Sequence, residues 1–219
     1  MNGFILPDDT VVEIGAGAGF SQQFIKHEII ATEVNPHSWI DACVDAMNLP
    51  FGPETIDVAI CSNVLHHFAH PLRFLLELRG CLKPRGRVLL VEPHPSFLLL
   101  LALHIMRHEG WSFEVDVFDP TAVANDPSDP WSGNNAISEL MFRDSRMFEK
   151  HAPGFEIVHN RFSECLMFPL SGGVTAKIKS LELPIAVLNF IDAVDRKLCR
   201  LSPKIFAMSR AVALRKQGA

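Results

Sequence analysis

A short apolar run that ends in a glycine-rich turn constrains the fold of this chain more than any other feature. Residues 10–14 are rich in β-branched and apolar side chains, which predicts a strand, and residues 15–19 read Gly-Ala-Gly-Ala-Gly. Glycine lets the backbone turn sharply and approach a ligand closely. A short helix predicted over residues 20–27 offers unpaired N–H groups at its start. The segment therefore predicts a strand, a ligand-binding turn and a helix in succession.

Strands alternate with helical segments through the first 92 residues. We predict further strands over residues 29–34, 42–45, 55–61 and 87–92, and one helix over residues 71–82 that a Lys-Pro-Arg-Gly turn ends. Such alternation is typical of a mostly parallel sheet that is covered on both faces. The gap between Val34 and Ala42 is too short for the usual crossover helix.

The C-terminal part of the chain departs from this rhythm. A helix is predicted over residues 145–152, and strands are predicted over residues 155–162 and 205–214. Two long connections, residues 93–144 and 169–204, are too long to be ordinary loops of a compact sheet. Long insertions at one end of a sheet usually recognise the substrate, so we expect that role for both connections.

Three acidic residues, Glu13, Glu33 and Asp45, fall near the ends of three successive predicted strands. The glycine spacing is G-x-G-x-G, because Phe20 stands where a dinucleotide fingerprint has its third glycine. The Glu13 carboxylate would repel a pyrophosphate and suits a positive amino group, so an NAD-dependent oxidoreductase is disfavoured. Glu33 can accept hydrogen bonds from ribose hydroxyls, and Asp45 can accept one from an adenine amino group. The pattern indicates a nucleoside that carries a cation.

Because the glycine turn and the three acidic residues occur in this order along the predicted strands, the sequence resembles the class I S-adenosylmethionine-dependent methyltransferases, in particular the methyltransferase type 11 group. The resemblance covers residues 10–92. Residues 45–51 resemble the family's adenine-contacting D-A-x-x-L-P-F segment, residues 62–68 its N-V-L-H-H segment beside the sulfonium, and residues 82–87 its L-K-P-G-G turn. The cofactor-binding residues that the resemblance implies are Glu13, Gly15, Gly17, Gly19, Glu33, Asp45, Ala46, Ser62 and Asn63.

The resemblance implies a Rossmann-like α/β three-layer sandwich, with a seven-stranded, mostly parallel sheet whose last strand is antiparallel. It implies an enzyme that moves a methyl group from S-adenosylmethionine to an O, N or C atom of a small-molecule acceptor, such as a lipid or glycan-pathway intermediate. We treat residues 1–219 as a single methyltransferase domain. Within it, residues 1–92 bind the cofactor, and residues 93–144 and 169–204 are substrate-side insertions.

A catalytically silent protein that binds S-adenosylmethionine, or serves as a scaffold, is the alternative. Members of the family usually have a helix before the first strand that helps to close over the cofactor. Only nine residues precede Thr10 in this sequence. Either the start of the chain is trimmed or another segment supplies the cover.

Two adjacent histidines, His66 and His67, follow the fourth predicted strand. They are the candidate catalytic base, which is needed only if the acceptor must lose a proton. A histidine in this position also often caps a helix or lines the cofactor without moving a proton. His66 and His70 are four residues apart, as are the histidines at 104 and 108. Such pairs form a zinc site only if they meet in space or a carboxylate joins one of them, so we assign no metal.

The charge of the chain is unevenly distributed. The net charge of -5 disfavours a general nucleic-acid binder, but residues 196–219 contain seven Lys or Arg and no acidic residue. Four of these basic residues either solvate one face of a helix or attract anionic lipid or a phosphorylated substrate: Arg196, Lys197, Arg200 and Lys204. The apolar run over residues 97–106 is shorter than the roughly 20 residues that a membrane span needs. It predicts a core or lid helix, with peripheral membrane contact as the alternative.

The five cysteines are odd in number and form no CxxC pair, which disfavours a disulfide framework or a zinc knuckle. A reduced, cytoplasmic setting fits this usage best, and the first residues do not resemble a secretory signal. Trp131, Asn134 and Asn135 lie in the first insertion and are candidate substrate contacts. The sequence leaves the oligomeric state open.

Overall fold

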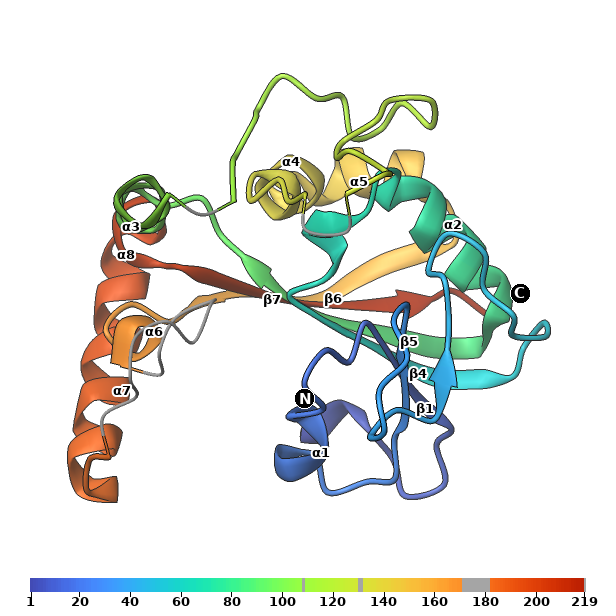
Figure 1. Cartoon of the computed structure of the whole chain (residues 1–219), viewed down its shortest axis with the longest axis horizontal. Helices are drawn as coiled ribbons and strands as arrows, with labels where there is room; N and C mark the ends of the chain where they lie inside the picture. Colours follow the sequence, from blue (N-terminus) through green and yellow to red (C-terminus); the bar gives the residue numbers. More distant parts are fainter. Residues whose placement is uncertain (108, 130–131, 171–181, 219) are drawn as a thin grey trace.

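A computed structural model of the chain describes residues 1–107, 109–129, 132–170 and 182–218 (Figure 1). Within these residues, seven strands form one sheet in the order β3-β2-β1-β4-β5-β7-β6. The strands are β1 (Val11–Ile14), β2 (Ile30–Glu33), β3 (Ala42–Cys43), β4 (Ile56–Ser62), β5 (Leu82–Pro93), β6 (Phe155–Ser163) and β7 (Ser209–Lys216). β1 to β5 pair in parallel, whereas β7 is antiparallel to both of its neighbours. The predicted mostly parallel sheet with an antiparallel last strand is confirmed.

Helices cover the two faces of the sheet unequally (Figure 1). α2, α4 and α5 lie over one face, the short η1 and α1 lie over the other, and α3, α7 and α8 form a separate lobe at one edge. The helices of the described residues are η1 (Asn2–Phe4), α1 (Ser21–Phe24), η2 (Leu65–His67), α2 (Pro71–Cys81), α3 (Phe97–Met106), α4 (Ile137–Phe142), α5 (Ser145–His151), α6 (Met167–Leu170), α7 (Ile185–Leu201) and α8 (Pro203–Phe206). None of these helices has both the length and the hydropathy to cross a membrane.

The main core lies between the sheet and the α2, α4 and α5 layer. Apolar residues recur along α2 at helical spacing and are buried there, and Phe142 of α4 and Phe148 of α5 join them. The opposite face is covered mainly by Ile25 and Ile29, with Phe4 and Ile5 partly buried beside them. The second helical layer of the predicted sandwich is therefore thin.

The predicted helix over residues 20–27 is wrong in length, because α1 has only four residues. The Asn2 side chain interrupts it: its amide donates to the carbonyl oxygen of Phe24 and accepts from the N–H of Lys26. The chain then leaves the helix extended at Ile25, which is buried. The third strand is likewise shorter than predicted, because Asp45 accepts the N–H of Met47 and turns the chain.

The last strand also begins later than predicted, at Ser209. Pro203 occupies the first turn of α8, where a fixed backbone angle favours a helix, so Ile205 is helical. The fifth strand is longer than predicted, and it includes the Lys-Pro-Arg-Gly segment with Arg85 in the left-handed region at a φ of 65°. α3 begins and ends at the bounds of the apolar run from residue 97 to 106, as predicted, but within it only Leu99 and Leu103 are buried, so it is not a core helix.

Candidate active site

The carboxyl ends of four parallel strands place most of the predicted cofactor residues along one edge of the sheet. Glu13 lies in β1, Glu33 ends β2, and Asp45 follows β3 by two residues. Ser62 ends β4, which pairs with β1. In open α/β sheets this edge is where ligands bind.

The glycine loop between β1 and α1 has a left-handed backbone at each of its three glycines. Their φ angles are +71° at Gly15, +52° at Gly17 and +73° at Gly19. A Cβ atom on Gly15 would lie 2.3 Å from Cγ2 of Val64, so close packing requires glycine there. A Cβ atom on Gly17 would have no atom within 4 Å among the described residues. The loop therefore packs tightly at its first glycine and is open at its second.

Glu13 is 1% exposed, and only one of its carboxylate oxygens is satisfied. Its Oε1 accepts the hydroxyl proton of Ser21, whereas Oε2 has no hydrogen-bond partner in the described part of the chain. Burial raises the pKa of this carboxyl group, although the Ser21 hydrogen bond acts in the opposite direction. A buried, unsatisfied acceptor suits a ligand that brings a hydrogen-bond donor, such as an amino group.

Glu33 and the segment that follows it close around the glycine loop. The Glu33 carboxylate accepts the N–H of Gly17 at 3.0 Å and the N–H of Val34 at 2.7 Å. Residues 34–41 contain no helix, as expected, but Trp39 donates from Nε1 to the carbonyl oxygen of Gly17 at 2.9 Å. The ring of His37 stacks on Trp39. Residues 34–41 are therefore held against the glycine loop through Trp39.

The other predicted cofactor residues lie nearby but make fewer contacts. Asp45 is exposed and Ala46 packs partly buried against the main core. Asn63 has a φ of 53° and donates its N–H to the carbonyl oxygen of Val91 at 2.7 Å. Their cofactor contacts remain predictions from the resemblance.

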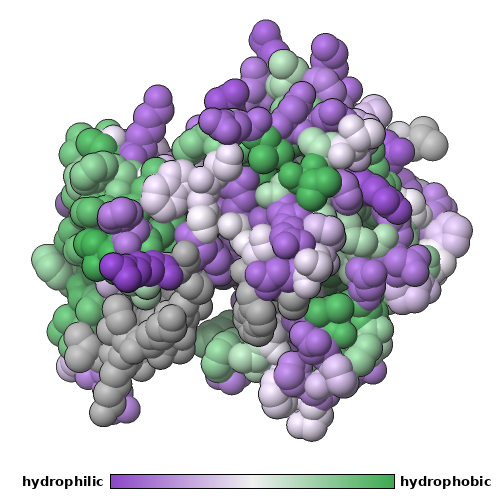
Figure 2. Space-filling model, turned by 45° about the horizontal axis from the view of Figure 1, so that its top comes forward, coloured by the Kyte–Doolittle hydropathy of each residue, from purple (hydrophilic) through white to green (hydrophobic). Residues whose placement is uncertain are grey.

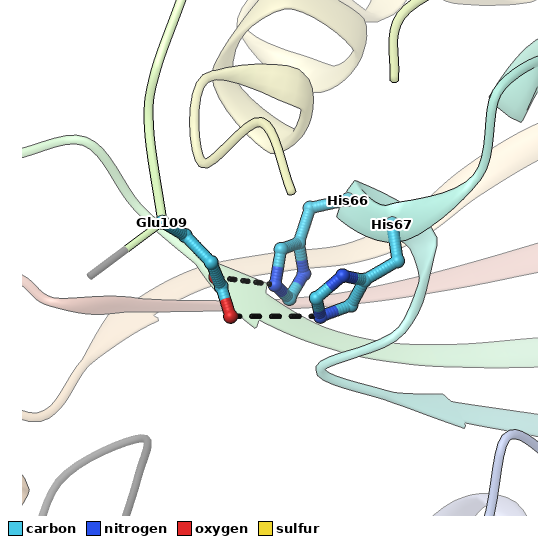
Figure 3. A group of neighbouring side chains, drawn as sticks. All are labelled: His66, His67 and Glu109. Carbon is cyan, nitrogen blue, oxygen red and sulfur yellow. Dashed lines mark ion pairs between the residues drawn. The ribbon is translucent and has the colours of Figure 1, made fainter. Parts of the chain in front are cut away.

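His66 lies buried between Glu92 and Glu109, the second of which Figure 3 shows beside it. Its Nδ1 is 2.6 Å from Oε2 of Glu92, and its Nε2 is 3.3 Å from Oε2 of Glu109. Burial disfavours charge on the ring, but the hydrogen bonds and negative charges of Glu109 and Glu92 outweigh it and raise the pKa of His66 to about 9. Glu92 also accepts the backbone N–H groups of Val64 and Leu65, which fixes η2.

His67 lies beside His66 in a different environment. Its Nδ1 is 2.9 Å from the carbonyl oxygen of Ser132, and its Nε2 is 3.8 Å from Oε1 of Glu109. Its side chain is 21% exposed, whereas that of His66 is 1% exposed. Burial and the neighbouring charge of His66 lower the pKa of His67. His67 is therefore the more accessible and the less basic of the two.

An open hollow of about 430 Å³ lies beside these histidines, in the insertion of residues 93–144. Ser132, which accepts from His67, lines it together with Asn134, a predicted substrate contact. Asn135, the other predicted amide, is buried and donates to Glu109. Trp131, the histidine at 108 and residues 171–181 of the second insertion lie outside the described residues.

Sequence reasoning missed two glutamates of the site. Glu92 lies near the end of β5, so the strand-end pattern that found Glu33 contained the signal for it. Glu109 follows α3 in the first insertion and reaches His66 through tertiary structure, which no local pattern indicates. Glu13 in β1 and Glu92 in β5 lie on either side of β4, which carries Cys61. Burial, and after it the charges of Glu92 and Glu13, raise the pKa of the Cys61 thiol.

The fold and the site together define a class: Rossmann-like proteins that bind a small ligand over a glycine loop at the carboxyl ends of their strands. Residues 12–90 match the family model described as a methyltransferase domain. Two solved structures have the same fold over nearly the whole chain. The first is an S-adenosylmethionine-dependent methyltransferase from Archaeoglobus fulgidus, with a TM-score of 0.57 and 18% identity over 95% of this chain and 86% of that one.

The second is an S-adenosylmethionine-dependent methyltransferase from Methanosarcina mazei, with a TM-score of 0.53 and 15% identity over 99% of this chain and 96% of that one. No curated protein sequence matches the chain. Residues 12–90 are therefore similar to a methyltransferase domain, and the chain shares the fold of S-adenosylmethionine-dependent methyltransferases, which supports an enzyme that uses S-adenosylmethionine as its cofactor. The site fits this cofactor for two reasons. Oε2 of Glu13 is a buried acceptor without a partner among the described residues, and a Cβ atom on Gly17 would meet none of their atoms within 4 Å, which leaves room for a ligand.

Proposed function

We propose that this methyltransferase acts on a small-molecule acceptor that binds beside η2, next to the insertion of residues 93–144. The observation that supports this proposal is the hollow of about 430 Å³ that Ser132 and Asn134 line. Ser132 contacts His67, and Val64, which precedes η2 in the chain, packs on Gly15 of the cofactor loop. The acceptor site and the cofactor site therefore share one segment of chain.

The proposed cofactor contacts follow from the strand-end residues. Glu13 and the glycine loop hold the methionine part, and Glu33 holds the ribose hydroxyls. Asp45 and Ala46 contact the adenine, and Ser62 and Asn63 line the sulfonium side. When bound, S-adenosylmethionine supplies an activated methyl group, whose bond to sulfur breaks as a lone pair of the acceptor forms the new bond. The protein has mainly to align the reactants and exclude water.

His66 and His67 are the proposed groups for an acceptor that must lose a proton. His67 is the better placed, because its side chain reaches the solvent side and its pKa is lowered by burial and by His66. His66 is held between Glu92 and Glu109, and it is protonated at neutral pH because its pKa is about 9. In this proposal His66 positions Glu109 and His67, and His67 takes the proton.

A lipid or glycan-pathway intermediate is the proposed class of acceptor, and contact with an anionic membrane is the proposed partner interaction. Figure 2 shows hydrophobic side chains gathered over the lobe of α3, α7 and α8. On α3, Phe97, Leu101 and Ile105 are exposed at a spacing of four residues, which aligns them on one helix face. Exposed Arg200 and Lys204 lie in α7 and α8, and such cations favour anionic lipid.

A reduced, cytoplasmic setting is also part of the proposal. All five cysteines are free thiols, of which Cys43 is exposed and the other four are buried. Free thiols persist where the compartment is reducing, which supports this setting.

Calorimetry with S-adenosylmethionine tests the cofactor assignment. The intact chain is expected to bind one equivalent, and Glu33→Ala is expected to weaken binding at least tenfold, because removal of hydrogen bonds from a carboxylate costs about 1.5–3 kcal/mol. Glu28→Ala is the matched control, since Glu28 is an exposed glutamate just before β2 and should leave the affinity unchanged.

Two outcomes contradict parts of this proposal. Equal affinity in the intact chain and in Glu33→Ala removes the ribose role from Glu33. Binding of S-adenosylmethionine without turnover across a broad panel of lipid, sugar and small polar acceptors favours the alternative of a catalytically silent protein.

A further inference from the structure

The two neighbouring histidines of η2 both have their Nδ1 atoms bound to acceptors. His66 Nδ1 lies 2.6 Å from a carboxylate oxygen of Glu92, and His67 Nδ1 lies 2.9 Å from the carbonyl oxygen of Ser132. These oxygen atoms accept hydrogen bonds, so each Nδ1 carries the proton. In a neutral imidazole the other ring nitrogen, Nε2, then presents a lone pair.

Both Nε2 atoms face the same carboxylate (Figure 3). Glu109 Oε2 is 3.3 Å from His66 Nε2, and Glu109 Oε1 is 3.8 Å from His67 Nε2. Asn135 donates to Glu109 Oε2 at 3.3 Å and helps to hold the carboxylate there. His66 Nε2 has no hydrogen-bond partner among the described residues, although the side chain is 1% exposed. Without an ion, a proton on His66 Nε2 balances the Glu109 carboxylate; a divalent cation among the three groups would replace that proton and engage both Nε2 lone pairs and the carboxylate.

We propose that His66, His67 and Glu109 bind a divalent metal ion of the zinc type. One possible ligand atom from each residue lies within 4.8 Å of the others. Bonds of about 2.0–2.2 Å place the ligands of a tetrahedral ion roughly 3.4 Å apart, so small side-chain shifts complete the site. Two histidines and one carboxylate leave a fourth position for a water molecule or a substrate, as in catalytic zinc sites.

The residues around the three ligands support this assignment. Histidines that bind metal usually donate their remaining N–H to a carboxylate or a backbone carbonyl, and Glu92 and Ser132 are these acceptors here. The sequence pairs His66 with His70 as possible ligands, but His70 does not belong to the group of His66, His67 and Glu109, and its Nδ1 lies 2.9 Å from the carbonyl oxygen of Ala122. From the sequence, a zinc site required a carboxylate close to one of these histidines, and Glu109 is that carboxylate.

The open position of the ion would serve the acceptor. Ser132 and Gly110, which adjoin His67 and Glu109, line the hollow proposed for the acceptor. A hydroxyl or thiol that binds the ion from this side releases its proton to solvent more readily, because the metal lowers its pKa. His67 is then a ligand and not the base. This role rests on the proposed methyl transfer, whereas metal binding by itself does not.

Metal titration of the purified chain tests the proposal. We would use the Cys43→Ser background, because the exposed Cys43 thiol can bind zinc by itself. After treatment with a chelator, the protein is titrated with Co²⁺, followed by visible absorption, and with Zn²⁺, followed by calorimetry. One ion per chain is expected. Glu109→Gln and His67→Ala should each weaken binding by at least about tenfold.

His70→Ala is the matched control and should bind both ions as tightly as the parent, with circular dichroism showing that every variant is folded. The proposal is overturned if neither ion binds in a one-to-one ratio, or if Glu109→Gln and His67→Ala bind as tightly as the control. Binding of S-adenosylmethionine is measured on the same samples. Cofactor binding without metal binding rejects the metal site and leaves the proposed function, with His67 as the base, in place.

Discussion

At the scale of single residues, two glycines of the same loop are needed for different reasons. Gly15 is fixed by packing, because a Cβ atom there would lie 2.3 Å from the Val64 side chain. Gly17 meets nothing within 4 Å in the part of the chain that the structure describes, although its φ of +52° still disfavours other residues. Stability therefore depends on the first glycine, and ligand access depends on the second.

Alanine substitutions at these two positions should separate the two requirements. Gly15→Ala combines left-handed strain with overpacking and should cost about 3 kcal/mol or more, which lowers Tm by roughly 6–12 °C. Gly17→Ala should cost only about 1–2 kcal/mol and lower Tm by roughly 2–8 °C, but it should weaken S-adenosylmethionine binding by tenfold or more. Thermal unfolding and calorimetry on the same preparations measure both effects. Equal Tm values for the two variants would contradict this assignment of roles.

At the scale of elements, one buried arginine ties the last strand to the helices above it. Arg210 of β7 donates from Nη1 to the carbonyl oxygen of Ser138 at 3.0 Å and to Glu139 at 2.9 Å. It also donates from Nη2 to the carbonyl oxygen of Phe142 at 2.7 Å, so it satisfies two carbonyls of α4. Its guanidinium lies over the ring of Phe162 in β6. Burial lowers the pKa of Arg210, while the nearby Glu139 opposes that shift.

Removal of this arginine should loosen α4 from the sheet. Arg210→Met leaves Glu139 and two carbonyl groups without their donor, which typically costs about 3–5 kcal/mol. Arg215→Met is the matched control on the same strand, because the pair of Arg215 with Glu156 lies near the surface and contributes about 0–1 kcal/mol. Urea unfolding of the two variants measures the difference. A loss in Arg210→Met no larger than that in Arg215→Met would show that α4 is held by apolar contacts alone.

The elements that the sequence predicted best are those with a local cause. β-Branched runs between turn residues predicted β1, β2 and β4, and the apolar run from residue 97 to 106 predicted α3. The ends of α1 and the start of β7 were missed because Asn2 and Pro203 decide them. Asn2 acts through a contact that is distant in sequence, so no window around residues 20–27 contains its signal.

The residues of the candidate site also divide into those with a local sequence signal and those that only tertiary structure brings in. Glu13 and Glu33 belong to short motifs beside strands. In the structure Glu13 accepts from Ser21 of α1, just after the glycine loop, and Glu33 accepts from Gly17 within the loop. Glu109 lies 43 residues after His66 in the sequence. It enters the site only because the loop after α3 brings it to His66 of η2, and no local sequence pattern indicates that contact.

At the scale of the whole molecule, the basic end of the chain is two separate features. Arg210, Arg215 and Lys216 lie in β7 and contact Glu139, Glu156 and the carbonyl oxygen of Leu82 respectively. The remaining basic residues of this stretch are exposed on α7 and α8: Arg196, Lys197, Arg200 and Lys204. Asp192 pairs with the first of them. Of the seven basic residues after residue 195, these four are the ones that the proposed anionic surface would attract.

The lobe that carries these cations also carries the exposed apolar residues, so vesicle binding should depend on both. The intact chain is expected to sediment with vesicles that contain phosphatidylserine and to bind vesicles of phosphatidylcholine alone more weakly. Phe97→Ser combined with Ile105→Ser should reduce binding by about tenfold or more, because these two side chains are 62% and 70% exposed on one face of α3. High salt should also weaken binding, since salt screens the cations.

The control for this experiment is Phe24→Ser, which removes an equally exposed aromatic side chain from α1 on another part of the surface. This variant should bind vesicles like the intact chain, because membrane attachment through one lobe leaves α1 in water. The same loss in the control as in the α3 variant would mean that any exposed apolar side chain adheres to lipid. An intact chain that ignores both kinds of vesicle but forms dimers, and loses them when Phe97 and Ile105 are replaced, would assign the same face to a second copy of the chain.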